Sequence, residues 1–155
     1  MRALVPVSLL AALAIAPAAQ PLAAAPADPC RQAAVSKRLG TMVAWLNGGR
    51  GDRFAAGFTP TGRWQPYTRT VAPPGVVGRR RITQLATISI GAEAEWHLSA
   101  LRRVGAGRYT INVAVQANDR PWGRGRTALS VDCRTGLVRS WIGPATRHPL
   151  PVDDD

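Results

Sequence analysis

Few residues in this chain of 155 residues suit acid–base chemistry, and one strand-like stretch holds the best of them. Glu95, His97 and Ser99 alternate with apolar residues, so they would share one face of a strand. A histidine next to a carboxylate suits proton transfer near neutral pH. We therefore take His97, Glu95 and Tyr67 as the catalytic candidates. Such a strand face is more often solvated than catalytic, because catalysis needs these groups buried and perturbed.

Several other ionisable residues are expected to have structural roles. Asp52 is expected to cap a helix, Asp119 to stand in a turn, and Asp132 to point away from the apolar face of its strand. His148 lies in the C-terminal tail. Two distant histidines and a terminal run of aspartates do not make a tetrahedral metal site, and we expect no metal and no cofactor.

Large aromatic residues are the candidates for binding an apolar ligand, with Arg63 or Arg69 as a partner for an anionic group. The equal alternative is that these aromatic residues simply fill the core. The ligand-binding candidates are Trp45, Trp64, Tyr67 and Trp96.

The first 27 residues have the composition of a secretory signal. Arg2 precedes an apolar run from Leu4 to Ala16, and Ala25-Pro26-Ala27 fits the small-x-small cleavage pattern. We predict a signal peptide at 1–27, one domain at 28–145 and a flexible tail at 146–155; cleavage after Ala18 or Ala19 is the alternative. No later run approaches about 20 apolar residues. We therefore expect a secreted or otherwise extracytoplasmic protein without a transmembrane segment in its mature form.

Cys30 and Cys133 are the two cysteines of the chain, and both survive that cleavage. Because an exported chain meets oxidising surroundings, we predict a disulfide between them. Two separate buried thiols are the less favoured alternative, since Cys30 stands in a polar, terminal stretch that no core would otherwise hold. Closing a loop of roughly 100 residues would stabilise the fold by at most about 4.7 kcal/mol.

The formal net charge is +11, and Lys37 is the only lysine among 20 basic residues. A positive field of this size favours anionic partners, such as phospholipid head groups, envelope polymers or nucleic acid. The arginines are scattered rather than striped, and no nucleic-acid-binding motif is present. We therefore do not expect nucleic acid as the partner.

Three helices are predicted ahead of the long strands. Apolar residues at 35, 39, 42, 43 and 46 indicate an amphipathic helix over 31–47, which Asn47-Gly48-Gly49 would end. Gly40 inside it suggests close packing on that side. Asp52 is expected to cap a short second helix. Helical spacing over 79–90 predicts the third.

Alternation of apolar and polar residues predicts strands in the second half of the chain. Residues 107–141 fit three antiparallel strands, with a break formed by residues 119–125. A loop is expected at 134–136, where Gly136 stands at the position at which a hairpin bulge favours positive φ. The segment 93–104 fits a helix by its charges, or a strand with a bulge near Leu101. We choose the strand, because residues 105–107 then make a hairpin loop. Pro66 restricts the strand around Trp64 to a short or edge position.

A family resemblance depends on the order of these elements and on a set of residues within them, namely Trp45–Gly48, Asp52, Phe54, Phe58–Pro60, Trp64–Tyr67, Val131–Gly136 and Trp141–Pro144. With these residues the chain resembles the NTF2-like superfamily, which includes ketosteroid isomerase and scytalone dehydratase, and within it the exported bacterial members with the same VDC-x-TG-x-V-x-x-W ending. The resemblance covers almost all of the mature chain. It implies an α+β fold in which a curved antiparallel sheet of four or more strands wraps around two or three N-terminal helices. It also implies a cone whose mouth holds an apolar ligand, and a homodimer through the sheet.

Three functions are compatible with such a fold, because one fold hosts many activities. The favoured one is a module that binds a small apolar or anionic ligand, or a protein partner. The second is an isomerase-like or dehydratase-like enzyme that uses the acid–base candidates, by analogy of fold alone. The third is a structural or interaction protein of the cell envelope, which would use Thr110, Asn112 and Gln116 on the outer sheet face or an exposed Trp122 with its arginines.

Overall fold

The computed structural model describes residues 28–66, 75–118 and 120–143, without the side chains of Arg120 and Trp122. The predicted signal peptide and tail, Tyr67, Arg69, Asp119 and His148 lie outside the described residues. The elements in chain order are α1 (Gln32–Asn47), α2 (Gly51–Ala56), β1 (Phe58–Gln65), β2 (Val76–Val77), α3 (Arg79–Gly91), β3 (Ala94–Gly105), β4 (Arg108–Ala117), β5 (Arg120–Val131) and β6 (Val138–Ile142).

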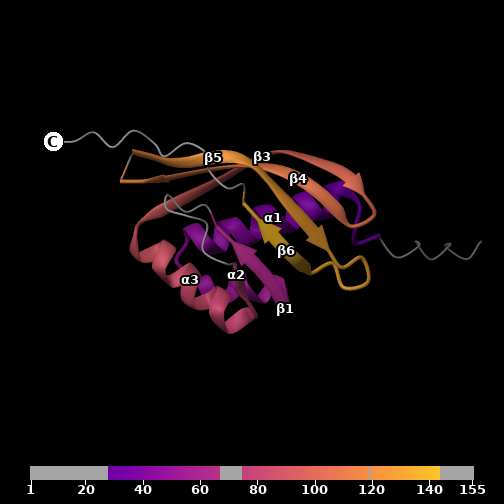
Figure 1. The fold of residues 1–155 in the computed structure, drawn as a ribbon, viewed down its shortest axis with the longest axis horizontal. Helices are drawn as coiled ribbons and strands as arrows, with labels where there is room; N and C mark the ends of the chain where they lie inside the picture. Colours follow the sequence, from indigo (N-terminus) through magenta and orange to yellow (C-terminus); the bar gives the residue numbers. More distant parts are fainter. Residues whose placement is uncertain (1–27, 67–74, 119, 144–155) are drawn as a thin grey trace, which may run out of the picture.

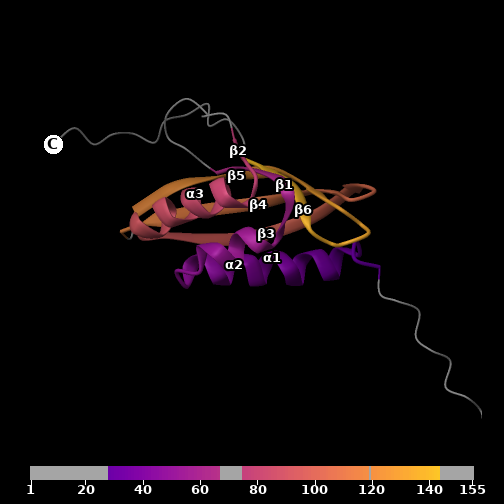
Figure 2. The ribbon, with the colours of Figure 1, turned by 90° about the horizontal axis from the view of Figure 1, so that it is seen from below.

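The strands form one mixed sheet in the order β2-β1-β6-β5-β4-β3. Neighbouring strands are antiparallel except β1 and β6, which run parallel. The long strands lie in front of α1 in Figure 1. Figure 2 shows α1 and α2 as a layer beneath the arched sheet. The predicted α+β class is confirmed, although one parallel pair interrupts the antiparallel order that we expected.

The ambiguous segment 93–104 is a strand, as predicted. β3 pairs with β4 along its whole length, and the register shifts between Ser99 and Arg102. Ala100 takes φ of 51° at this bulge, close to the predicted position at Leu101. The hairpin loop at 105–107 is also confirmed, and its Gly107 has φ of 62°. The alternation of apolar and polar residues therefore predicted the structure of this segment correctly, whereas the charges at its ends, which suggested a helix, did not.

The predicted break at 119–125 is wrong, because β5 already begins at Arg120. Pro121, Gly123 and Gly125 all pair with residues of β4. On its other side β5 pairs with β6 only from Ala128 to Val131. The first half of β5 is thus an edge, where a proline without an N–H and glycines without side chains are tolerated.

The first helix ends as predicted and begins within one residue of the prediction. Its last turn is closed by hydrogen bonds from Gly49 N to Leu46 O and from Arg50 N to Trp45 O, a Schellman arrangement in which Gly49 has φ of 75°. The expectation about Gly40 is wrong: this residue is exposed, and a Cβ atom there would meet nothing within 4 Å. No helix of the described residues is long and apolar enough to cross a membrane.

Two further expectations near β1 need correction. α2 begins at Gly51 after Arg50, and its N-cap makes no side-chain hydrogen bond, so Asp52 lies in the first turn instead of capping it. There its carboxylate still suits the positive end of the helix dipole. β1 stops before Pro66, but it has 8 residues and lies between β2 and β6, so it is neither the short strand nor the edge strand that we expected.

Side-chain amides of α1 bind the outer edge of β3, which is the last strand of the sheet. The Asn47 side chain accepts from Trp96 N and donates to Trp96 O, both at 2.9 Å. The Gln32 side chain donates to Leu101 O at 2.9 Å. These bonds satisfy backbone groups that no neighbouring strand reaches, and they place α1 along this edge.

The predicted disulfide is confirmed: Cys30 and Cys133 are bonded across a sequence separation of 103 residues, with their Cα atoms 5.1 Å apart. Cys133 lies in the turn after β5, two residues beyond the end of the strand in which we expected it. The hydroxyl of Tyr109 on β4 donates to the carbonyl oxygen of Cys30. The start of α1 is thereby held against the sheet at two points.

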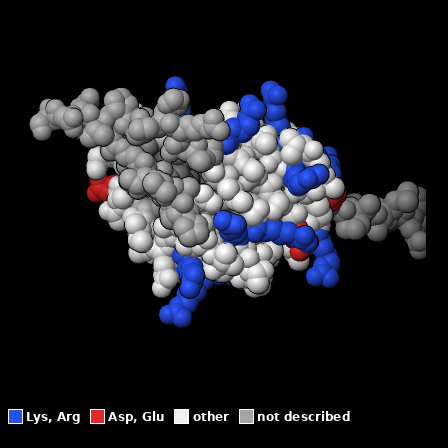
Figure 3. All heavy atoms as spheres, in the orientation of Figure 1, with Lys and Arg blue, Asp and Glu red and all other residues white. Residues whose placement is uncertain are grey.

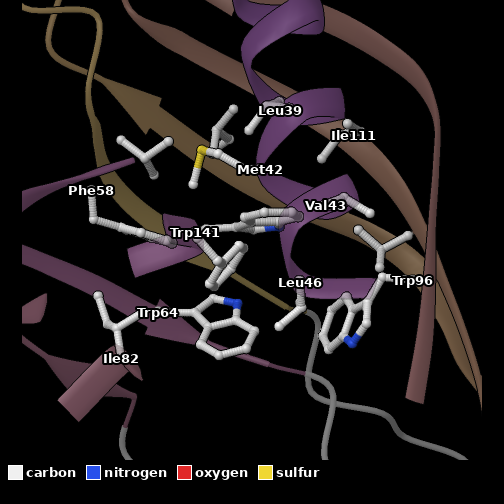
Figure 4. Packing of buried hydrophobic residues seen from close by; sticks show 14 of the residues in the cluster. Leu39, Met42, Val43, Leu46, Phe58, Trp64, Ile82, Trp96, Ile111 and Trp141 are labelled. Atoms are coloured by element: carbon white, nitrogen blue, oxygen red, sulfur yellow. The ribbon is translucent and has the colours of Figure 1, made fainter. Parts of the chain in front are cut away.

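Aromatic side chains fill the space between helices and sheet. Trp64, Trp141 and Phe54 are each at most 2% exposed, and Figure 4 shows Trp64 and Trp141 close to Met42 and Leu46 of α1. The Trp141 indole N–H donates to Thr127 Oγ1 at 3.0 Å. Among the described residues, every buried side-chain nitrogen or oxygen atom has a hydrogen-bond partner. The buried polar atoms of the described interior are therefore satisfied within the protein.

Candidate functional site

The acid–base candidates of β3 lie on the outer face of the sheet, away from the helices. His97 and Glu95 side chains are 51% and 54% exposed, with His97 Nε2 3.5 Å from Glu95 Oε1. Gln116 of β4 donates to Glu95 Oε2 at 3.0 Å and lies 3.2 Å from His97 Nε2. Water reaches both ionisable groups, so the enclosed proton-transfer site that an isomerase needs is not formed by them. Tyr67, the third candidate, lies outside the described residues.

Two of the four aromatic candidates belong to the core. Trp64 and Trp96 are 1% and 3% exposed, and their ring centroids lie 5.7 Å apart. The Trp96 indole N–H donates to Ser89 Oγ of α3 at 3.0 Å. Their surfaces are thus occupied by protein. Arg63, named as an anion partner, is exposed on β1, and Tyr67 and Arg69 are not described.

Trp45 is different, because it is only partly buried and borders an open groove along α1. We call this hollow, of about 490 Å³, the α1 groove. Apolar side chains form most of it, and two cations stand on its helical wall. Its lining residues are Ala34, Lys37, Arg38, Thr41, Met42, Trp45, Ala56, Gly57 and Leu137.

Glycines shape two walls of the α1 groove. A Cβ atom at Gly57 would come within 2.8 Å of three side-chain atoms of Met42. The absence of a side chain at Gly57 therefore allows Met42 to pack against its backbone. Gly136, with φ of 73°, turns the chain after β5 and leaves room for the guanidinium of Arg38. That guanidinium donates to the Gly136 carbonyl oxygen. The turn therefore fixes the position of Arg38.

Asp132 belongs to the same turn and acts as a structural residue there. Its Oδ1 accepts from the backbone N–H of Arg134 at 3.0 Å and lies 3.4 Å from a guanidinium nitrogen of Arg139. The hydrogen bond from Arg134 and the charge of Arg139 lower the pKa of Asp132, against partial desolvation. A carboxylate held ionised in this way is a poor general base. In the described ranges no three His, Cys, Asp or Glu residues come together as a metal site would require.

The sequence singled out Trp45 but missed the rest of the α1 groove. Ala34, Arg38, Thr41 and Trp45 are spaced three and four apart, and they lie beside the apolar stripe of α1 instead of within it. A tryptophan outside the buried stripe was the available signal. Leu137 and Gly57 come from other elements, so no local pattern pointed to them.

Solved structures share this fold at low sequence identity. A protein of unknown function with a cystatin-like fold from Methylobium petroleophilum PM1 matches with a TM-score of 0.61 and 18% identity, over 76% of this chain and 81% of that one. An epoxide hydrolase/cyclase-like enzyme of pyran ring formation in the polyether salinomycin matches with a TM-score of 0.57 and 14% identity, over 72% and 92%. An NTF2-like protein of unknown function from Cytophaga hutchinsonii ATCC 33406 gives 0.53 and 8%, over 72% and 87%.

No protein-family model and no curated protein matches the sequence. The structural likeness confirms the NTF2-like fold that the sequence resemblance implied. Enzymes and proteins without an assigned activity occur among the similar structures. The fold alone therefore does not select an activity.

Proposed function

We propose that this NTF2-like domain is a binding module whose α1 groove holds a small amphipathic ligand with an acidic head. The apolar part of the ligand would lie against Trp45, Met42 and Leu137, and its acidic group beside Lys37 and Arg38. The observation that carries the proposal is the partly exposed Trp45 next to two cations in one groove.

The size and surface of the α1 groove support a small ligand. Small-molecule sites commonly measure roughly 300–1,000 Å³ and are mostly apolar with a few placed polar groups. The groove, at about 490 Å³, falls within that range. An indole provides a large contact area at a small cost in side-chain entropy, which is why tryptophan often dominates binding energy.

The cations of the groove support an acidic head group. The Gly136 carbonyl oxygen takes one N–H of Arg38, and a guanidinium has five in a fixed fork. The remaining N–H groups of Arg38 therefore point in a defined direction before a ligand arrives. This reduces the conformational entropy that Arg38 would lose on binding. Lys37, one residue away on α1, adds a second positive charge.

The filled interior supports binding at the α1 groove in preference to the mouth of the cone. Trp64, Trp96 and Trp141 occupy the space between sheet and helices among the described residues. His97 and Glu95 lie on the opposite, solvated side of the sheet. These positions favour a binding role over the isomerase-like or dehydratase-like alternative.

Titration calorimetry with decanoate, and with decanol as its neutral match, tests the proposal. We expect decanoate to bind more tightly than decanol, and Trp45→Ala to weaken decanoate binding at least about tenfold, which corresponds to about 1.4 kcal/mol. Lys37→Gln should weaken decanoate and leave decanol unchanged. Arg81→Gln on α3 removes the same charge far from the groove and is the matched control. Equal binding of both probes, or full binding by Trp45→Ala, would overturn the proposal.

We also propose that the domain works outside the cytoplasm. The bond between Cys30 and Cys133 supports this, because disulfides persist in oxidising compartments. The signal-like composition of residues 1–27 points the same way. Export would bring the mature chain, with Asp28 as its first residue, to anionic lipids and polymers of the envelope.

A further inference from the structure

The outer sheet face is a second surface with its own chemistry. Cross-strand partners point to the same side of a sheet, so the pairing registers define which residues share this face. All of them are exposed or partly exposed. The outer sheet face consists of Arg63, Gln65, Val77, Glu95, His97, Ser99, Arg102, Gly105, Arg108, Thr110, Asn112, Ala114, Gln116, Pro121, Arg124, Arg126, Ala128, Ser130, Ser140 and Ile142.

Positive charge dominates this face. It carries the arginines at 63, 102, 108, 124 and 126 and a single carboxylate, Glu95. In Figure 3, blue side chains project from this side around an uncharged centre, and red is visible only near its margins. Two ion pairs occur in the described part of the chain, and neither includes an arginine of this face. Among the described residues, no ion pair therefore neutralises these arginines.

The uncharged residues of the face argue against a lipid surface. Hydroxyl and amide groups of Ser99, Asn112 and Ser130 stand between the arginines. Of the three large apolar side chains with the highest exposure, Ile88 lies on α3 and Val104 at the end of β3, and Val77 shares this face only at its β2 margin, where it pairs with Arg63. A face that attaches to a bilayer would be expected to offer apolar groups among its cations. The arch of the sheet in Figure 2 also limits its contact with a flat layer.

We infer that the outer sheet face binds a linear, phosphate-bearing polymer. Guanidinium groups match phosphate oxygens in a bidentate geometry that the ammonium group of lysine cannot reproduce. Arg124 and Arg126 stand two residues apart on β5, or about 6.8 Å along an extended strand. A flexible chain follows this curved row of charges, and the hydroxyl and amide groups donate to its remaining oxygens.

The same charges oppose the homodimer that the family resemblance implied. A two-fold contact through this face would bring the five arginines of each copy into one interface with a single carboxylate from each copy. Like charges facing each other across an interface disfavour association. A polyanion neutralises these charges instead, and the sheet stays free for it.

Binding of inorganic polyphosphate, followed by calorimetry at two salt concentrations, tests the inference. The pair Arg124→Gln and Arg126→Gln should weaken binding at least about tenfold and flatten the salt dependence. The pair Arg80→Gln and Arg81→Gln removes the same charge from α3 and should change affinity less than about twofold. Equal losses in the two pairs would show general attraction to a basic protein and overturn the inference.

Other polymers and a second measurement complete the test. Tighter binding of polyglutamate or of phosphatidylglycerol vesicles than of polyphosphate would each overturn the assignment. Amide shifts in NMR spectra should concentrate in β4 and β5 when polyphosphate is added, and shifts confined to α1 would contradict it. Lys37→Gln should leave polyphosphate binding unchanged, which separates this face from the α1 groove.

Discussion

Tyr109 places an ionisable phenol in the core, at the point where the sheet holds the start of α1. The side chain is 1% exposed, and its hydroxyl donates to the carbonyl oxygen of Cys30. Burial raises the pKa of Tyr109 above its ordinary value of 10.0, Asp28 adds to the rise, and Arg103 opposes it. The native state therefore prefers the protonated phenol.

This preference predicts a stability change at alkaline pH. A raised pKa contributes stability that is complete below the pKa of the unfolded tyrosine and is lost as the pH rises through the higher native pKa. Tyr109→Phe should cost about 1 kcal/mol near pH 7 through the lost hydrogen bond. Above about pH 10, the difference in unfolding free energy between wild type and variant should shrink. Urea unfolding of both proteins at neutral pH and on either side of that value measures it, and a constant difference would contradict the prediction.

The role of a single residue could be predicted from the sequence where that role depends on its neighbours in the chain. It could not be predicted where the role depends on elements that are distant in the sequence. The cysteine pairing followed from composition and compartment alone. Asp52 was misplaced because the helix starts at Gly51, two residues earlier than an N-cap at Asp52 would require. Trp64 and Trp96 had equal chances of lining a ligand site or filling the core, since exposure depends on elements that are distant in the sequence.

At the scale of elements, α1 contains a glycine that lowers the stability of the helix and that can be replaced. Gly40 lies in the middle of the helix on its exposed side, and an added methyl group would meet nothing within 4 Å. Gly40→Ala should therefore raise the unfolding free energy by about 0.5–1 kcal/mol, because alanine loses less backbone entropy in a helix. Chemical unfolding measures the gain. Unchanged or reduced stability would mean that Gly40 has a contact partner after all.

Gly107 is the matched contrast for that substitution. It has φ of 62° in the β3–β4 loop, and a Cβ atom there would lie 2.6 Å from the carbonyl oxygen of Val131. The same change to alanine should destabilise the protein, since it adds both a clash and a left-handed non-glycine residue. The two glycines thus distinguish helix propensity from loop geometry in one fold.

Helices and strands with one clear hydrophobic periodicity were predictable from the sequence. Segments whose residues gave conflicting indications could be assigned only from their pairing in the sheet. Alternation identified β3 and β4, and the three-to-four spacing identified α1 and α3. β5 was missed over its first half because Pro121 and its glycines have the composition of a turn. Pairing with β4 on one side only explains why such residues fit a strand, and no local pattern contains that information.

At the scale of the whole molecule, the chain closes on itself through one covalent bond. The bond joins a residue just before α1 to the turn after β5, so that the loop between its cysteines spans everything except β6 and the ends of the chain. The family resemblance implied the order and curvature of these elements. Their assembly around a filled interior, with two surfaces of different chemistry outside, emerged only from the structure.

Removal of this bond tests how much of the fold depends on it. The double substitution Cys30→Ser and Cys133→Ser should lower the unfolding free energy by about 2–4 kcal/mol, below the loop-entropy limit of about 4.7 kcal/mol. Guanidinium unfolding measures the loss, and the wild type with dithiothreitol should approach the variant. Because Tyr109 and the side chains of Asn47 and Gln32 still hold α1 to the sheet, the variant should remain folded. An unchanged unfolding midpoint would show that these hydrogen bonds alone fix the start of the chain.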